Sequence, residues 1–372
     1  MSFYGLAKGT VRGGVPSSRI DVYTICISSL KCGSDSILSA FDDAIADGVD
    51  IITASVSPLS IFSFLQDVVA IGSFHAMQKG ILTTHAVGNK GPTPSSVLSV
   101  APWLLSVAAS TIDRKFIDKL ILGNGKNFIG KSINTFPSNG TKFPIAQACP
   151  ARGNASREMR DCLDKNMVKG KLVLCGELGG EIPAFENGAI GSIINVTKSY
   201  VPFVTPKPSI YLVSNEFVHV QSYTNSTKYP VAEILKSEIF HDNNAPRIVD
   251  FSSRGPNPFI PEIMKPDISA PGVGILSAWS PFGPPSAVIG STDKRHVKYN
   301  IKSGTSMACP HVAGVAAYVK SFHPNWSPAA IKSAVMTTAK PVKGLYDDLA
   351  GEFAYGSGNI NPQQVVHPWT CL

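Results

Sequence analysis

Residues 304–314 read GTSMACPHVAG, and they place Ser306 at the start of an apolar run with helical spacing. The first turn of a helix leaves backbone N–H groups without intrahelical partners, and together with the helix dipole they favour negative charge beside a serine oxygen. Pro310 is tolerated near a first turn because it gives up an N–H that can lack a partner there. A bare Gly-Thr-Ser is more often an ordinary capped helix start, so it is the whole string that makes Ser306 a candidate nucleophile.

Strands and helices alternate along the first third of the chain. The apolar patterns predict a buried strand at 20–27, a helix at 35–47, a strand at 50–56, a helix at 65–79 and strands at 81–87 and 104–109. Near the C-terminus, one helix is expected from Ser306 and another from Ser327, with Pro328 at its first position. Strands joined by helices of this length indicate an α/β fold, a parallel sheet with helices on its faces.

The pattern changes in the middle of the chain. Short strands are expected at 170–175, 191–196 and 209–213, among polar and proline-containing segments. The α/β pattern returns only after Asn244. We therefore predict a small, mainly-β domain at 140–237, inserted between two parts of one larger domain at 1–139 and 238–372.

Bulk properties exclude several classes of protein. The chain has 372 residues, 44% of them hydrophobic and 16% charged, as expected for a globular protein. Its formal charge of +7 is spread out, without the basic block typical of nucleic-acid binding. No apolar run is long enough to cross a bilayer, and the N-terminus lacks a signal-peptide pattern. The seven cysteines show no CxxC metal spacing, and neither a metal nor a cofactor is expected.

Asn89 is the second candidate site residue. It follows the predicted strand at 81–87 and precedes Gly91-Pro92. The carboxyl ends of strands in open α/β sheets are where ligands bind, and an asparagine amide there can donate to an oxyanion. Taken alone, however, Gly-Asn is more often only a turn.

Several segments together resemble plant subtilisin-like serine proteases of the cucumisin type. They read FYGLAKGT at 3–10, FSSRGP at 251–256, KPDISAPG at 265–272 and GTSMACPHVAG at 304–314. The resemblance implies a subtilisin-like fold, incomplete at the N-terminus, with a protease-associated (PA) domain as the insert. It also implies a serine endopeptidase that cleaves proteins or peptides through an acyl-enzyme on Ser306, with Asn89 in the oxyanion hole.

The catalytic base is expected outside this chain. Subtilases order their triad as Asp, His and Ser, so both earlier motifs should precede Phe3. Of the eight histidines, His311 should point away from Ser306, and His85 is better interpreted as a strand residue than as a base. A serine without a base is a weak nucleophile, so the alternative is a non-catalytic pseudoprotease or peptide-binding fragment.

The resemblance also implies the remaining site residues. Substrate would bind along Ser55, Val56 and Ser57, where Ser57 replaces the family's usual glycine, and along 86–88, which are Ala86, Val87 and Gly88. The implied disulfides are Cys26–Cys32 and Cys162–Cys175, whereas Cys309 is expected to pack as a small buried side chain. Together with five Asn-x-Ser/Thr sequons, the family implies a secreted glycoprotein.

Overall fold

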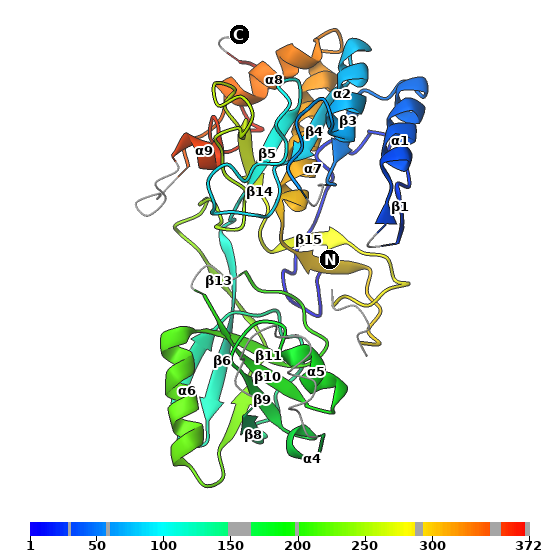
Figure 1. Ribbon diagram of the computed structural model, residues 1–372. Coiled ribbons are helices and arrows are strands. Elements are labelled where there is room, and N and C mark those ends of the chain that lie inside the picture. The colour runs from blue at the N-terminus through cyan, green and yellow to red at the C-terminus, as the bar shows by residue number, and fades with distance from the viewer. Residues whose placement is uncertain are drawn as a thin grey trace. The chain divides into compact units, whose positions relative to one another are not determined.

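The computed structural model (Figure 1) describes residues 1–28, 31–56, 60–147, 165–197, 201–286, 293–342 and 351–368. The chain forms two compact units, each assembled from separate stretches of sequence. Unit 1 contains residues 1–10, 114–241 and 274–302, and unit 2 contains residues 11–113, 242–273 and 303–372.

Unit 2 is built on a four-stranded parallel sheet in the order β14-β5-β4-β3. Its strands are β3 (Ile51–Ala54), β4 (Leu82–Ala86), β5 (Leu105–Ser110) and β14 (Ile268–Pro271). All three pairings are parallel, which confirms the sheet type expected from the sequence. The first three strands were predicted, and β14 was not.

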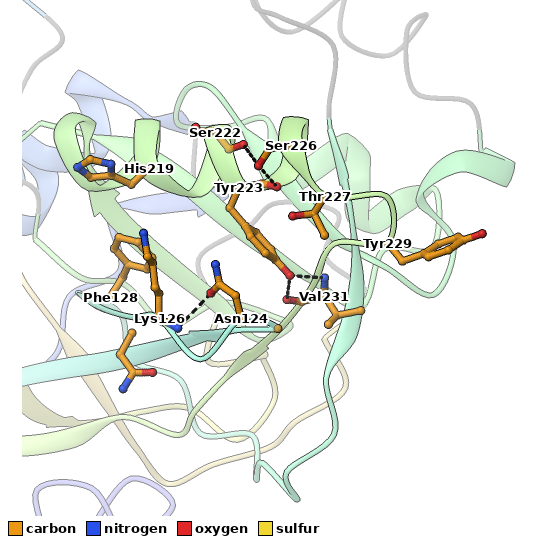
Figure 2. Close-up of a pocket in the computed structure, with 12 residues that line it drawn as sticks. Asn124, Lys126, Phe128, His219, Ser222, Tyr223, Ser226, Thr227, Tyr229 and Val231 are labelled. Atoms are coloured by element: carbon orange, nitrogen blue, oxygen red, sulfur yellow. Dashed lines mark hydrogen bonds between the residues drawn. The ribbon is translucent and has the colours of Figure 1, made fainter.

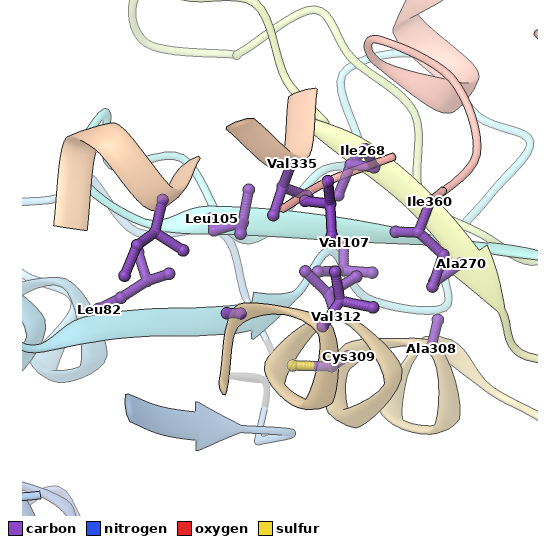
Figure 3. Packing of buried hydrophobic residues seen from close by; sticks show 14 of the residues in the cluster. Leu82, Leu105, Val107, Ile268, Ala270, Ala308, Cys309, Val312, Val335 and Ile360 are labelled. Carbon is purple, nitrogen blue, oxygen red and sulfur yellow. The ribbon is translucent and has the colours of Figure 1, made fainter. Parts of the chain in front are cut away.

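Helices cover both faces of this sheet. On one face, α1 (Ser34–Ala46) and α2 (Val68–Gln78) pack against Ile52 and Ala54 of β3. On the other face, α7 (Thr305–Phe322) and α8 (Pro328–Thr337) pack against β4, β5 and β14. Figure 3 shows this second layer, in which Val107 and Ala270 of the sheet face Ala308, Cys309 and Val312 of α7. Side chains alternate across a strand, so each strand supplies both layers.

Helix boundaries in unit 2 follow local chemistry. Ser327 caps α8 by accepting a hydrogen bond at Oγ from the Ala330 N–H at 3.2 Å, and Pro328 occupies the first helical position, as predicted. Gly48, just beyond α1, has φ +70°, a left-handed conformation that glycine adopts without cost. The short helix α9 (Glu352–Tyr355) is the last of the described helices.

The predicted strand at 20–27 is wrong over most of its length. Only Cys26–Ser28 (β1) is a strand, paired with Lys31–Cys32 (β2) in a two-stranded ribbon. Ile20 and Val22 are 85% and 83% exposed. An apolar run becomes a buried strand only where another strand pairs with it, and none of the described residues pairs with 20–25.

Unit 1 contains an eight-stranded mixed sheet. The order is β11-β10-β9-β8-β12-β6-β13, with β7 also paired to β6. The strands are β6 (Arg114–Leu122), β7 (Asn127–Gly130), β8 (Phe143–Gln147), β9 (Leu172–Cys175), β10 (Gly191–Val196), β11 (Ser209–Val213), β12 (Val231–Ile234) and β13 (Glu238–His241). A separate hairpin joins β15 (Ile275–Ala278) and β16 (Tyr299–Lys302).

The middle of the chain contains the predicted strands together with elements that were not predicted. The strands expected at 170–175, 191–196 and 209–213 are present as β9, β10 and β11, but they run parallel, and the region also contains α4 (Lys165–Val168), α5 (Glu181–Glu186) and α6 (Ser214–Ser226). In addition, β6 pairs with β12, and the main stretch of unit 1 covers residues 114–241.

The four cysteines among the described residues are two in a disulfide and two free, buried thiols. Cys26 and Cys32 are joined by a disulfide across the β1–β2 ribbon. Cys175 is a free, buried thiol in β9, so the structure does not form the implied Cys162–Cys175 bond, and Cys162 lies outside the described residues. Cys309 is also free and fully buried, as expected.

A buried carboxyl group should make the stability of unit 1 depend on pH. Asp118 in β6 is 1% exposed and accepts hydrogen bonds from the hydroxyls of Ser132 and Ser237. Burial raises its pKa to about 7, against the opposing effect of those two hydrogen bonds. In this window the folded state holds a proton that the unfolded state has lost, so stability falls as pH rises from about 4 to 7.

We expect the Asp118→Asn variant to lose this slope. Relative to the variant, the wild-type free energy of unfolding should fall by up to about 1.4 kcal/mol per pH unit in that window and level off above pH 7. Urea unfolding followed from pH 4 to 8 measures the difference between the two proteins. Parallel pH profiles would show that Asp118 titrates normally.

Candidate active site

The nucleophile candidate lies in the first turn of α7. Ser306 is the second residue of this helix and is half-buried. Its Oγ donates to the Ser55 carbonyl at 3.2 Å, and the Ser55 hydroxyl donates to the Ser306 carbonyl at 3.1 Å. Two reciprocal hydrogen bonds therefore join the end of β3 to the start of α7.

Asn89 lies beside the same helix terminus. Its Oδ1 accepts hydrogen bonds from the Thr305 N–H at 3.0 Å and from the Thr305 hydroxyl at 2.9 Å. With Oδ1 held in this way, Nδ2 lies near Gly304, where an added Cβ would be 3.7 Å from it. Among the described residues, Nδ2 has no hydrogen-bond acceptor, so it can donate to a group that arrives beside Ser306.

The turn that delivers Asn89 requires glycine. Gly88 has φ +98°, and a Cβ there would lie 2.7 Å from Leu98 Cδ1. A larger residue would have to shift this part of the core. The turn at the carboxyl end of β4 therefore depends on Gly88 to present Asn89.

The implied substrate-binding residues differ in their exposure to solvent. Ser55 is exposed and Val56 half-buried directly after β3, whereas Ser57 lies outside the described residues. Ala86 and Val87 are fully buried in core clusters, and Gly88 is buried as well. The side chains of Ala86 and Val87 therefore support the site from within the core.

His85 lies on the face of the sheet opposite to Ser306. Its neighbour Thr84 faces α7, with Oγ1 3.4 Å from Cys309 Sγ. The next side chain along a strand points the other way, so His85 lies on the α2 face, where Nε2 donates to the Val56 carbonyl at 2.7 Å. Burial lowers the pKa of His85, which favours the neutral ring. The interpretation of His85 as a strand residue is thus supported.

Within the part of the chain that the structure describes, no histidine of unit 2 forms a hydrogen bond with Ser306. His311 Nδ1 is 2.7 Å from the Met307 carbonyl of its own helix, and His323 Nε2 is 2.8 Å from the Val366 carbonyl. His75 lies in the last turn of α2, and His367 lies near the C-terminal end of the described chain. In the described part of unit 2, the candidate nucleophile and the candidate oxyanion donor lie at one helix terminus, and no base is hydrogen-bonded to Ser306.

One described cavity lies within unit 1. It has a volume of about 750 Å³ and is lined by residues of β7, of α6 and of the loops beside them, including Phe128, His219, Tyr223 and Tyr229 (Figure 2). It contains none of the residues predicted to form the active site. The Tyr223 hydroxyl is already occupied by the backbone N–H and carbonyl of Val231. This cavity is therefore not the predicted active site.

Two features of the site were missed in the sequence. The first is the contact of Ser55 with Ser306, and the second is the bond between Thr305 and Asn89. These pairs are separated by 251 and 216 positions, so no local pattern indicates them. One sequence signal indicates that the Ser306 carbonyl needs another partner, because Pro310 lies four residues after Ser306 and cannot donate to that carbonyl.

Comparison with known proteins identifies the family. Residues 4–358 match the model described as the subtilase family. The chain is 52% identical to subtilisin-like protease SBT4.3 of Arabidopsis thaliana over 99% of its length and 51% of that protein, and 49% identical to SBT4.13 of the same plant over 99% and 50%. It thus spans about half the length of these relatives.

A solved protein structure is also similar to this chain. Sphericase aligns with 93% of this chain and 69% of its own, with 19% identity and a TM-score of 0.46. The assignment rests on the sequence matches, which extend over nearly the whole chain. On these matches, the chain belongs to the subtilase family of serine proteases and has its subtilisin-like fold.

Proposed function

We propose that this chain carries the nucleophile part of a serine endopeptidase. Ser306 would attack the carbonyl carbon of a peptide bond and form an acyl-enzyme, with proteins or peptides as substrates. The observation that carries the proposal is the placement of Asn89 by Thr305, the residue next to the nucleophile. It leaves the Asn89 Nδ2 as a donor beside the helix terminus that holds Ser306.

The geometry is suited to stabilising an oxyanion. The tetrahedral intermediate places negative charge on the former carbonyl oxygen, and preorganised donors stabilise that charge. Asn89 would supply one donor, and the Ser306 N–H in the first turn of α7 would supply another, aided by the helix dipole. Neither requires reorganisation when the substrate arrives, because both are held by the fold.

The base and its orienting carboxylate are proposed to come from polypeptide outside residues 1–372. In support, the Ser306 hydroxyl donates to the Ser55 carbonyl and not to a histidine. The same observation favours the alternative function, a non-catalytic protein that binds peptides. The two functions differ in whether Ser306 can be activated.

Reaction with a fluorophosphonate probe tests the proposal, because the probe modifies activated serines. We would compare residues 1–372 alone with the same residues fused behind the region that precedes the match in SBT4.3. Labelling of the fusion, lost on Ser306→Ala, is the expected result. Labelling of residues 1–372 alone would place a base within this chain. A folded fusion that fails to react would favour the peptide-binding alternative.

We also propose that the protein is exported and glycosylated and that the middle region is a PA domain. The Cys26–Cys32 disulfide suits an oxidising compartment, and the sequon residues Asn139, Asn225 and Asn325 are exposed. None of the described helices is long and apolar enough to cross a membrane. A fall in mass after N-glycosidase treatment of the plant-expressed protein would support export, and an unchanged mass would argue against it.

A further inference from the structure

The first turn of α7 contains an unusual backbone gap. In an α-helix, the N–H of residue i+4 donates to the carbonyl of residue i. For Ser306 that donor would come from residue 310, which is a proline without an N–H. The carbonyl of the candidate nucleophile therefore lacks its normal helical partner.

The hydroxyl of Ser55 takes the place of that missing donor. Ser55 Oγ donates to the Ser306 carbonyl at 3.1 Å, while Ser306 Oγ donates back to the Ser55 carbonyl at 3.2 Å. The carbonyl and the hydroxyl of the nucleophile are thus both held by one residue of the neighbouring strand end.

The fit between strand and helix explains why Ser55 is in position. Thr53 and Ser55 lie two residues apart and so share one face of the strand, whereas Ser306 and Cys309 lie three apart and share one face of the helix. Thr53 Oγ1 lies 3.5 Å from Cys309 Sγ, and Ser55 bonds with Ser306. The two contacts therefore run side by side along the interface of β3 and α7.

We propose that Ser55 is a positioning residue for the nucleophile. Its hydroxyl replaces the N–H that Pro310 lacks and thereby fixes the first turn of α7, so that Ser306 Oγ occupies one place relative to Asn89. The inference rests on the proposed function, because it concerns the reactivity of Ser306. A small displacement of a reacting atom can lower a rate severely, but Ser55 is exposed and water can partly replace it. We therefore expect an effect of about tenfold.

Four variants test the role in whichever form of the protein reacts with the fluorophosphonate. Ser55→Ala should lower the second-order rate constant of labelling about tenfold. Pro310→Ala should leave it within about twofold, because it restores a backbone donor without removing the hydroxyl. The double variant S55A/P310A should recover most of the lost rate, since the new N–H can satisfy the Ser306 carbonyl. Thr53→Ala is the matched control, a hydroxyl on the same strand face that contacts Cys309 instead, and it should leave the rate unchanged.

Recovery of the labelling rate by Pro310→Ala would show that Ser55 acts by positioning Ser306 and not through a general effect on the fold. Wild-type labelling of Ser55→Ala would overturn the proposal, as would a double variant no faster than Ser55→Ala. If no form of the protein reacts, the proposed function fails. Thermal unfolding then tests whether the hydrogen bond from Ser55 to the Ser306 carbonyl stabilises the fold. Ser55→Ala should lower the melting temperature by about 2–4 °C, and by less in the Pro310→Ala background. Equal shifts in the two backgrounds would overturn the proposal even without activity.

Discussion

Replacing Asn89 with alanine should lower kcat for peptide hydrolysis about 100- to 1,000-fold in a form of the protein that has its base, with a much smaller change in KM. This magnitude is taken from the corresponding change in subtilisin, a relative within the family. The physical reason is that Nδ2 would bond to charge that develops only in the transition state. Steady-state kinetics on a chromogenic peptide measure the effect.

Asn89 also has a structural role that the experiment must separate from the chemical one. Its Oδ1 accepts from both the N–H and the hydroxyl of Thr305, so alanine would remove two hydrogen bonds as well as the donor. Asn89→Asp is the matched control. It keeps an acceptor for Thr305, places a favourable negative charge at the start of α7, and lacks the Nδ2 donor.

The two variants should therefore differ in stability but not in their loss of activity. Asn89→Ala should melt at a lower temperature than wild type, whereas Asn89→Asp should melt at or above the wild-type temperature. Both should lose at least 100-fold in kcat. Retention of activity by Asn89→Asp would show that Asn89 acts only by holding Thr305, and another donor would then have to serve the oxyanion.

Elements with strong periodicity could be predicted from the sequence, and elements that depend on distant partners could not. The helix at Ser306 and strands β3, β4 and β5 have apolar spacing and glycine or serine boundaries that act locally. Strand β14 follows Pro266 and ends at Pro271, two local signals for a loop, and it forms because β5 is available to pair with it. The apolar run at 20–25 has the local pattern of a strand but does not form one, because no described strand pairs with it.

Motifs indicated the candidate site residues but not the contacts that these residues make. Ser306 and Asn89 were identified from motifs, and the structure brings both to the start of α7. Strand alternation shows which face of the sheet His85 lies on only when the contact of Thr84 with α7 is known. That contact depends on tertiary structure and cannot be predicted from the sequence. The hydrogen bond from Ser55 to the Ser306 carbonyl likewise depends on tertiary structure. The sequence shows only that this carbonyl needs a donor, because Pro310 has no N–H.

The buried ion pairs of Asp267 should produce the largest loss of stability. Asp267 lies 2.7 Å from the Lys265 ammonium and 3.1 Å from the Lys332 ammonium, and it also accepts from the Ser106 N–H at 2.7 Å. Burial alone would raise the pKa of Asp267, but the two lysines together bring it below its ordinary value. Burial lowers the pKa of Lys265 to about 8, with Asp267 opposing that shift. The network thus holds a fully buried lysine in its charged form at neutral pH.

Asp267→Asn should destabilise unit 2 by about 3–5 kcal/mol at pH 7, the usual cost of leaving one member of a buried pair charged and alone. Arg247→Gln is the matched control, because it removes a 3.6 Å pair whose arginine is 42% exposed, and it should cost at most about 1 kcal/mol. Urea unfolding at pH 7 measures both changes. Equal effects of the two substitutions would mean that the buried network contributes no more than a surface pair.

The dependence on pH gives a second test of the same network. Without Asp267, the folded-state pKa of Lys265 should fall below its wild-type value of about 8, so the variant begins to gain stability at a lower pH than the wild type. The difference between the two proteins should therefore narrow as pH rises towards 8 and stay constant above it, where Lys265 is neutral in both folded states. Adding Lys265→Met to the variant should recover much of the loss at pH 7 and abolish this narrowing, because the buried charge is then absent. A difference that stays the same from pH 6 to 9 would show that the cost comes from lost packing and hydrogen bonds, and not from the charge of Lys265.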